Sequence, residues 1–229
     1  LARSLQGKSA KLIGLIFPNI SNVFYAELID KLEHQLFKKG YKTIICNSEH
    51  DSEKEREYIE MLEANQVDGI ISGSHNLGIE DYNRVTAPII SFDRNLSPDI
   101  PVVSSDNYAG GVLAAHTLVK TGAQSIIMIT GNDNSNSPTG LRHAGFASVL
   151  PKAPIINVSS DFSPVRKEME IKNILTRQKP DAIFASDDLT AILVIKIAQE
   201  LGISVPEELK VIGYDGTYFI ENYYPQLAT

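Results

Sequence analysis

The chain has few of the residues that build disulfides and membrane spans. Its 229 residues include one cysteine, Cys46, so no internal disulfide can form. Cys46 lies at the end of an apolar run, which predicts a buried strand residue and not a nucleophile. No apolar run is long enough to cross a bilayer, and the first residues do not resemble a signal peptide. These features are typical of a protein of the reducing cytoplasm.

Motifs that carry catalysis are also scarce. The sequence has no glycine-rich dinucleotide fingerprint, no phosphate loop with Gly-Lys-Ser/Thr and no Gly-x-Ser-x-Gly. Its five histidines show no metal-ligand spacing. Carboxylates are present, but no general acid and base pair can be singled out. We therefore expect a protein that is not an enzyme and that holds neither a metal nor a cofactor.

The chain also has fewer basic than acidic residues. Lysine and arginine number 21 against 28 aspartates and glutamates, so the net charge is −7. Contact with phosphates needs a basic face, which argues against nucleic-acid binding by this segment itself. The charged run at residues 53–57 is predicted to be a solvated helix face with ion pairs at spacings of three and four.

The sequence does have short apolar runs that alternate with longer amphipathic stretches. The alternation predicts parallel strands joined by right-handed crossovers through helices. It restarts after a break near residues 103–107, which predicts an α/β fold with two doubly wound lobes. The expected strands are residues 11–17, 42–46, 68–72, 88–92, 125–130, 155–158, 181–185 and 209–214. The expected helices are residues 22–39, 52–65, 107–121, 141–150, 164–178 and 189–201.

The ends of the expected strands are unusually polar. In parallel α/β sheets, ligands bind outside the carboxyl ends of the strands. If two lobes face each other, these ends line one cleft rich in hydroxyl, amide and carboxylate groups. A carbohydrate needs such groups and an aromatic face for its apolar side, which Phe24, Tyr25, Tyr108 and Phe162 could supply.

Four charged residues at these ends have competing interpretations. Asp187 and Asp188 precede an apolar helix, so one of them can cap it while the other contacts a ligand. Asp215 is either a turn residue or a ligand contact. Arg142 lies just inside a helix, where the helix dipole disfavours a cation. A planar fork of donors aimed at the cleft would explain its position.

Taken together, the motifs resemble the effector-binding core of the lac repressor family of bacterial transcription factors. Each motif is weak alone, but their order and spacing match over essentially the whole chain, and repressors of sugar catabolism in low-GC Gram-positive bacteria look nearest. The matching segments are Ala2-Arg-Ser-Leu5, Ile13-Gly-Leu-Ile16, Asn22-Val-Phe-Tyr25, Val67-Asp-Gly-Ile-Ile71, Phe92-Asp-Arg94, Val103-Ser-Ser-Asp-Asn107 with Gly110-Gly111, Arg142-His-Ala-Gly-Phe146, Asp181-Ala-Ile-Phe-Ala-Ser-Asp187 and Val211-Ile-Gly-Tyr-Asp215.

The resemblance implies a division of the chain into four parts. Residues 1–8 would be the remnant of a hinge helix, and residues 9–105 and 106–226 two lobes like those of periplasmic binding proteins, with a ligand cleft between them. Residues 227–229 would begin a crossover back to the first lobe, the rest of which is absent. Family ligand contacts fall on Asn22, Phe24, Tyr25, Ser72, Asp93, Arg142, Phe162, Ser186, Asp187 and Asp215.

The function implied is that of a sugar-responsive repressor. Its effector would be a sugar or sugar phosphate, and Arg142 and Asp215 would hold hydroxyls while Phe162 packs on the ring. An upstream helix-turn-helix domain would bind operator DNA, with Ala2, Arg3 and Leu5 in the hinge helix that enters the minor groove. A short hinge helix and two half-sites call for a homodimer.

Two departures and three alternatives stay open. Gly216 replaces an acidic or amide residue, and Ser186 stands where asparagine is frequent, so the identity of the sugar is in doubt. A secreted sugar receptor of a transporter would share the two-lobed architecture but carry a signal peptide or lipidated cysteine upstream. A family member could instead answer to a phosphocarrier protein or a purine corepressor. An enzyme would need a partner acid for Asp187 or Asp215.

Overall fold

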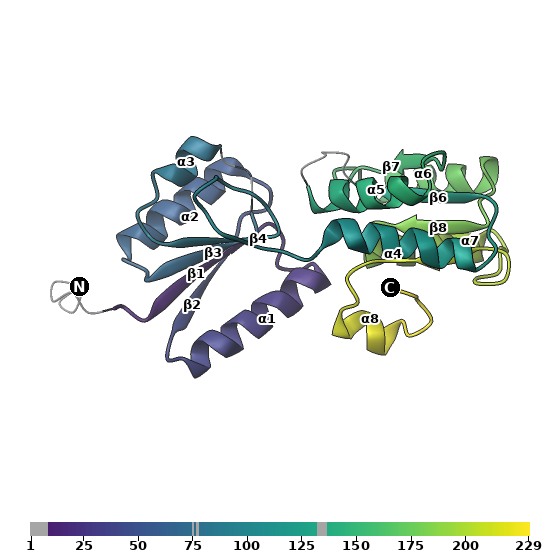
Figure 1. The fold of residues 1–229 in the computed structure, drawn as a ribbon. Coiled ribbons are helices and arrows are strands. Elements are labelled where there is room, and N and C mark those ends of the chain that lie inside the picture. The colour runs from purple at the N-terminus through teal and green to yellow at the C-terminus, as the bar shows by residue number, and fades with distance from the viewer. Residues whose placement is uncertain (1–8, 75, 77, 132–136) are drawn as a thin grey trace. The chain divides into compact units, whose positions relative to one another are not determined.

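The computed structural model describes residues 9–74, 76, 78–131 and 137–229. The chain forms two compact units that divide between Ser105 and Asp106. Each unit is a parallel sheet with helices on both faces (Figure 1). The predicted hinge residues Ala2, Arg3 and Leu5 lie outside the described residues. No helix of the described residues is long and apolar enough to cross a membrane.

The first unit is a five-stranded sheet in the order β2-β1-β3-β4-β5, with all neighbours parallel. The chain order reverses between β1 and β3, which makes the carboxyl ends of these two strands the topological switch point. The elements are β1 (Leu12–Phe17), α1 (Val23–Lys38), β2 (Lys42–Asn47), α2 (Ser52–Ala64), β3 (Gly69–Ser72), α3 (Ile79–Asn83), β4 (Ile89–Phe92) and β5 (Val102–Val103).

Alternate residues of the first sheet are buried on opposite faces. Leu15 and Phe17 pack against α1, while Ile16 and Cys46 pack against α2 and α3. Both faces are therefore apolar, as expected of a parallel sheet covered on both sides. Cys46 is 1% exposed, and burial raises the pKa of its thiol to about 11. The prediction of a buried strand cysteine is confirmed.

The second unit is a four-stranded parallel sheet in the order β7-β6-β8-β9. Its switch point lies between β6 and β8. Residue Ala228 adds a single parallel bridge to Ile212. The elements are α4 (Asn107–Lys120), β6 (Ile126–Thr130), α5 (Pro138–Val149), β7 (Ile155–Asn157), α6 (Pro164–Arg177), β8 (Ala182–Ala185), α7 (Asp188–Glu200), β9 (Lys210–Ile212) and α8 (Tyr218–Tyr223).

Helices α4 and α5 cross on one face of the second sheet at two glycines. A Cβ atom added to Gly111 would lie 2.0 Å from the carbonyl oxygen of Arg142, and one added to Gly145 would lie 2.0 Å from that of Tyr108. The two helix backbones therefore touch directly, which only glycine permits. This contact fixes the turn of α5 that carries Arg142.

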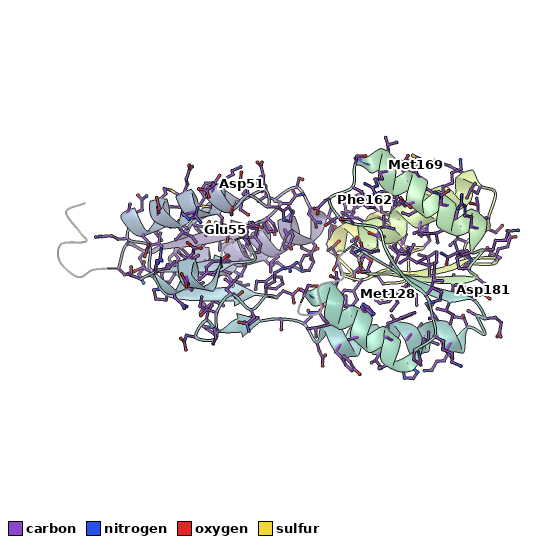
Figure 2. The ribbon with its side chains drawn as sticks, turned by 90° about the horizontal axis from the view of Figure 1, so that it is seen from above. Asp51, Glu55, Met128, Phe162, Met169 and Asp181 are labelled. Atoms are coloured by element: carbon purple, nitrogen blue, oxygen red, sulfur yellow. The ribbon has the colours of Figure 1, made fainter. Side chains whose placement is uncertain are left out.

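At the amino end of each sheet, an aspartate side chain accepts hydrogen bonds from backbone amides at or just before the start of the neighbouring strand. In the first unit, Asp68 Oδ2 accepts a hydrogen bond from the Leu12 amide at 3.0 Å. In the second, Asp181 accepts from the amides of Gln124 and Ser125 at 2.8 and 2.9 Å (Figure 2). Each aspartate ties the start of a central strand to the neighbouring strand, at the end of the sheet opposite the switch point.

Candidate functional site

All ten candidate ligand contacts lie in the last residue of a strand, in the loop after a strand, or within the first five residues of the helix that follows. Five belong to each unit. The first unit contributes Asn22, Phe24, Tyr25, Ser72 and Asp93. The second contributes Arg142, Phe162, Ser186, Asp187 and Asp215.

An aromatic cluster follows β1 in the first unit. The ring of Phe24 lies 5.4 Å from that of Tyr25 and 5.9 Å from that of Phe92, between ring centres. Tyr25 also contacts the buried Phe17 at 5.6 Å. Asn22 caps α1, because its Oδ1 accepts a hydrogen bond from the Phe24 amide at 2.9 Å. The cap thus sets the direction in which α1 presents both aromatic side chains.

The side chain of Ser72 points into the turn that follows β3 and forms hydrogen bonds within it. It is 1% exposed, and its hydroxyl exchanges 3.3 Å hydrogen bonds with the backbone of Ser74. Its side chain therefore shapes the turn after β3.

A buried carboxylate on α2 accepts hydrogen bonds from the turn after β3. Glu55 on α2 is fully buried and accepts hydrogen bonds from the Ser74 hydroxyl at 2.5 Å, the Asn76 side-chain amide at 2.8 Å and the Tyr82 hydroxyl (Figure 2). The Ser74 hydroxyl also meets that of Ser48 at 2.8 Å. The prediction of a solvated helix face is therefore wrong for Glu55, although the predicted pair between Arg56 and Glu53 is present.

Asp93 has an unusual backbone. It follows β4 with φ of 62°, in the left-handed region, and its amide donates to the Val103 carbonyl at 2.9 Å. Aspartate tolerates this region better than most residues, at a small energetic cost. Six other non-glycine residues of the described chain also have positive φ, so the conformation shapes the turn after β4 and does not by itself mark Asp93 as a ligand contact.

Arg142 is the centre of the second unit's candidate set. Its side chain is nearly buried, and Nε donates to Asn107 Oδ1 at 2.8 Å while Nη1 donates to the Ser186 carbonyl at 2.6 Å. Nη1 also lies 3.9 Å from Asp215 Oδ1. The guanidinium stacks on the Tyr214 ring, 3.5 Å from its centre. The structure thus brings three predicted contacts together in one cluster: Arg142, Ser186 and Asp215.

The two aspartates after β8 have different roles. Asp187 caps α7, since its carboxylate accepts hydrogen bonds from the Thr190 amide and hydroxyl, both at 2.8 Å. The Ser186 hydroxyl donates to the same carboxylate at 3.4 Å. Capping by one of the pair is confirmed, and Asp187 is that residue. Asp188 is buried and faces the loop after β9.

Phe162 forms a separate pair at the start of α6 (Figure 2). It packs against the core of the second unit, and the Arg166 guanidinium lies over its ring, 3.6 Å from the centre. One ring face is therefore covered by a cation that a stacked sugar would have to displace. Within the described residues, no cluster of histidine, cysteine, aspartate and glutamate could hold a metal ion.

Comparison with known proteins places this arrangement in a family. Residues 10–219 match the model described as periplasmic binding proteins and sugar binding domain of LacI family. The chain belongs to the LacI family. The sucrose operon repressor of Streptococcus mutans is 69% identical over 229 residues, all of this chain and 72% of that protein. That of Lactococcus lactis is 53% identical over 232 residues, again with 100% and 72% coverage.

A solved LacI-family structure supports the fold of this LacI-family core. The regulator from Alkaliphilus metalliredigens, complexed with D-xylulofuranose, is 32% identical with a TM-score of 0.82. The match covers 95% of this chain and 83% of that one. The predicted α/β fold with two parallel-sheet lobes is confirmed, and so is the predicted family. The relatives are transcriptional repressors and not enzymes.

Proposed function

We propose that this chain is the effector-binding core of a repressor that responds to sucrose or a close derivative. The observation that carries the proposal is the 69% identity, over the whole chain, to a sucrose operon repressor. Two further relatives with the same name are 53% and 51% identical over the whole chain. The proposal assigns no catalytic role, and of the candidate carboxylates Asp187 caps α7 and Asp215 lies beside Arg142.

The chemistry of the candidate contacts supports a furanose ring as the recognised element. Sucrose contains a fructofuranosyl ring, and the related regulator from Alkaliphilus metalliredigens holds another ketofuranose. Arg142 supplies the guanidinium donors that Asn107 and Ser186 do not use, and Asp215 and Asp187 supply acceptors for sugar hydroxyls. Phe24 and Tyr25 supply apolar ring surface.

The proposed mechanism is a population shift. The sugar would contact strand-end residues of the lobes and favour one of two conformations of the repressor. The conformation would control a hinge that includes Ala2, Arg3 and Leu5, and through it operator binding in the cytoplasm by a homodimer. A nearly complete switch needs about a 10⁴-fold preference of the sugar for one conformation.

A thermal-shift measurement tests the proposed ligand. Sucrose at about 100 times its Kd should stabilise the folded protein by about 2.7 kcal/mol and raise Tm by roughly 5 to 10 °C. Sucrose 6-phosphate, fructose and ribose serve as comparison sugars at the same concentrations. A rise with sucrose or its phosphate alone supports the proposal. Equal behaviour with all four sugars, or no rise with any, contradicts it.

A further inference from the structure

Asp188 is a buried carboxylate outside the proposed set of sugar contacts. It is the first residue of α7 and only 1% exposed. Its Oδ2 accepts a hydrogen bond from the Gly216 amide at 2.9 Å, and the Tyr214 amide and the Thr229 hydroxyl also lie close to the carboxylate. Burial raises the pKa of the Asp188 carboxyl above its usual value. Burial of a carboxylate costs free energy unless hydrogen bonds compensate for the lost water, so the contacts of Asp188 are expected to have a structural role.

The loop after β9 is what Asp188 holds. Asp215 has φ of 122° and Gly216 has φ of 58°, so two successive residues adopt positive φ. Gly216 adopts its φ freely, but the φ of Asp215 is strained and persists only when its surroundings impose it. Asp188 supplies that constraint through the Gly216 amide. Gly213 leaves room for the carboxylate beside the loop. A Cβ atom at this position would lie 2.1 Å from Asp188 Oδ1.

The constrained loop carries two of the four residues that contact the Arg142 head group, Tyr214 and Asp215. Asp215 lies 3.9 Å from Arg142 Nη1, and the Tyr214 ring lies under the guanidinium. A shift of the loop would move the carboxylate and the aromatic support of Arg142 at the same time. Asp188 is one residue from Asp187 and two from Ser186, whose carbonyl accepts from Arg142. The contacts thus form one connected set from α7 to the loop and to Arg142.

We propose that Asp188 is a positioning residue for sugar binding: by holding the Gly216 amide, it fixes Asp215 against Arg142. The proposal rests on the proposed function, in which Asp215 and Arg142 contact the sugar. What Asp188 supplies is a pair of acceptor oxygens, of which an asparagine keeps one and replaces the other by a donor.

The test compares sucrose affinity by titration calorimetry in variants of the protein at a temperature where all are folded. Asp188→Ala should bind sucrose at least about tenfold more weakly than the original protein. Asp188→Asn keeps one acceptor oxygen and should lose less affinity than Asp188→Ala. Asp181→Ala is the matched control, because Asp181 also accepts backbone amides in the second unit, but at the amino end of its sheet. It should lower Tm and leave affinity unchanged.

A second substitution separates positioning from general stability. If Asp188 acts through Asp215, then Asp188→Ala should weaken binding little further in a protein that already carries Asp215→Ala. Additive losses, or losses in Asp188→Ala and Asp181→Ala that follow their Tm values, would overturn the inference. So would weak binding by Asp215→Ala with normal binding by Asp188→Ala, which leaves the proposed function intact. Normal binding by Asp215→Ala, or no binding of sucrose by the original protein, contradicts the proposed function and the inference with it.

Discussion

Replacement of Arg142 by alanine is expected to weaken sucrose binding by at least about 100-fold, which corresponds to about 3 kcal/mol. The substitution removes charge-assisted donors, each worth about 1.5 to 3 kcal/mol. It also leaves Asn107 Oδ1 and the Ser186 carbonyl without their donor, and Asp215 without its cation. Titration calorimetry with sucrose measures the loss directly.

Two variants serve as controls for the Arg142 prediction. Arg142→Lys keeps the charge but not the planar fork, and it should lose a large part of the affinity because a lysine cannot reach Asn107, Ser186 and Asp215 together. Arg177→Ala removes an exposed arginine at the end of α6 in the same unit and should bind normally. Near-normal affinity in Arg142→Ala would show that Arg142 has no part in sugar binding.

Replacement of Glu55 by alanine is expected to lower the free energy of unfolding by about 3 kcal/mol or more. The fully buried carboxylate accepts from Ser74, Asn76 and Tyr82, and its removal strands these donors away from water at about 1 to 3 kcal/mol each. Urea unfolding monitored by circular dichroism measures the change.

Two variants serve as controls for the Glu55 prediction, one at another position of α2 and one at Glu55 itself. Glu57→Ala removes an exposed carboxylate from α2 and should change stability by less than about 0.5 kcal/mol. Glu55→Gln keeps one acceptor oxygen and should fall between the two. Equal stability of Glu55→Ala and Glu57→Ala would mean that the buried network does not support the turn after β3.

The sequence was sufficient to predict the long elements because their apolar residues recur with a clear period. The expected helix at residues 22–39 is α1, and the expected strand at residues 181–185 contains β8. Three short elements escaped prediction: α3, β5 and α8. They have two to six residues, too few for a period to show, and tertiary contacts decide their conformation.

The positions of the candidate contacts could be predicted, but their partners could not. Strand ends follow from the alternation of elements, and that alternation alone places residues such as Arg142 and Asp215 near them. Asn107 is 35 residues away from Arg142 in the chain, and nothing local links them. The same holds for Glu55, whose charged neighbours suggested a solvated face. Which side chains meet across a fold is set by packing, which a single sequence does not display.

The most direct test of the central claim is titration of sucrose against the protein and against one variant in each unit, Asp93→Asn and Arg142→Ala. The proposed function assigns sugar contacts to residues of both units, so we expect one saturable site per chain for the original protein and a clear loss of affinity in both variants. Undiminished binding in Asp93→Asn, with loss only in Arg142→Ala, would contradict it, since the sugar would then need the second unit alone.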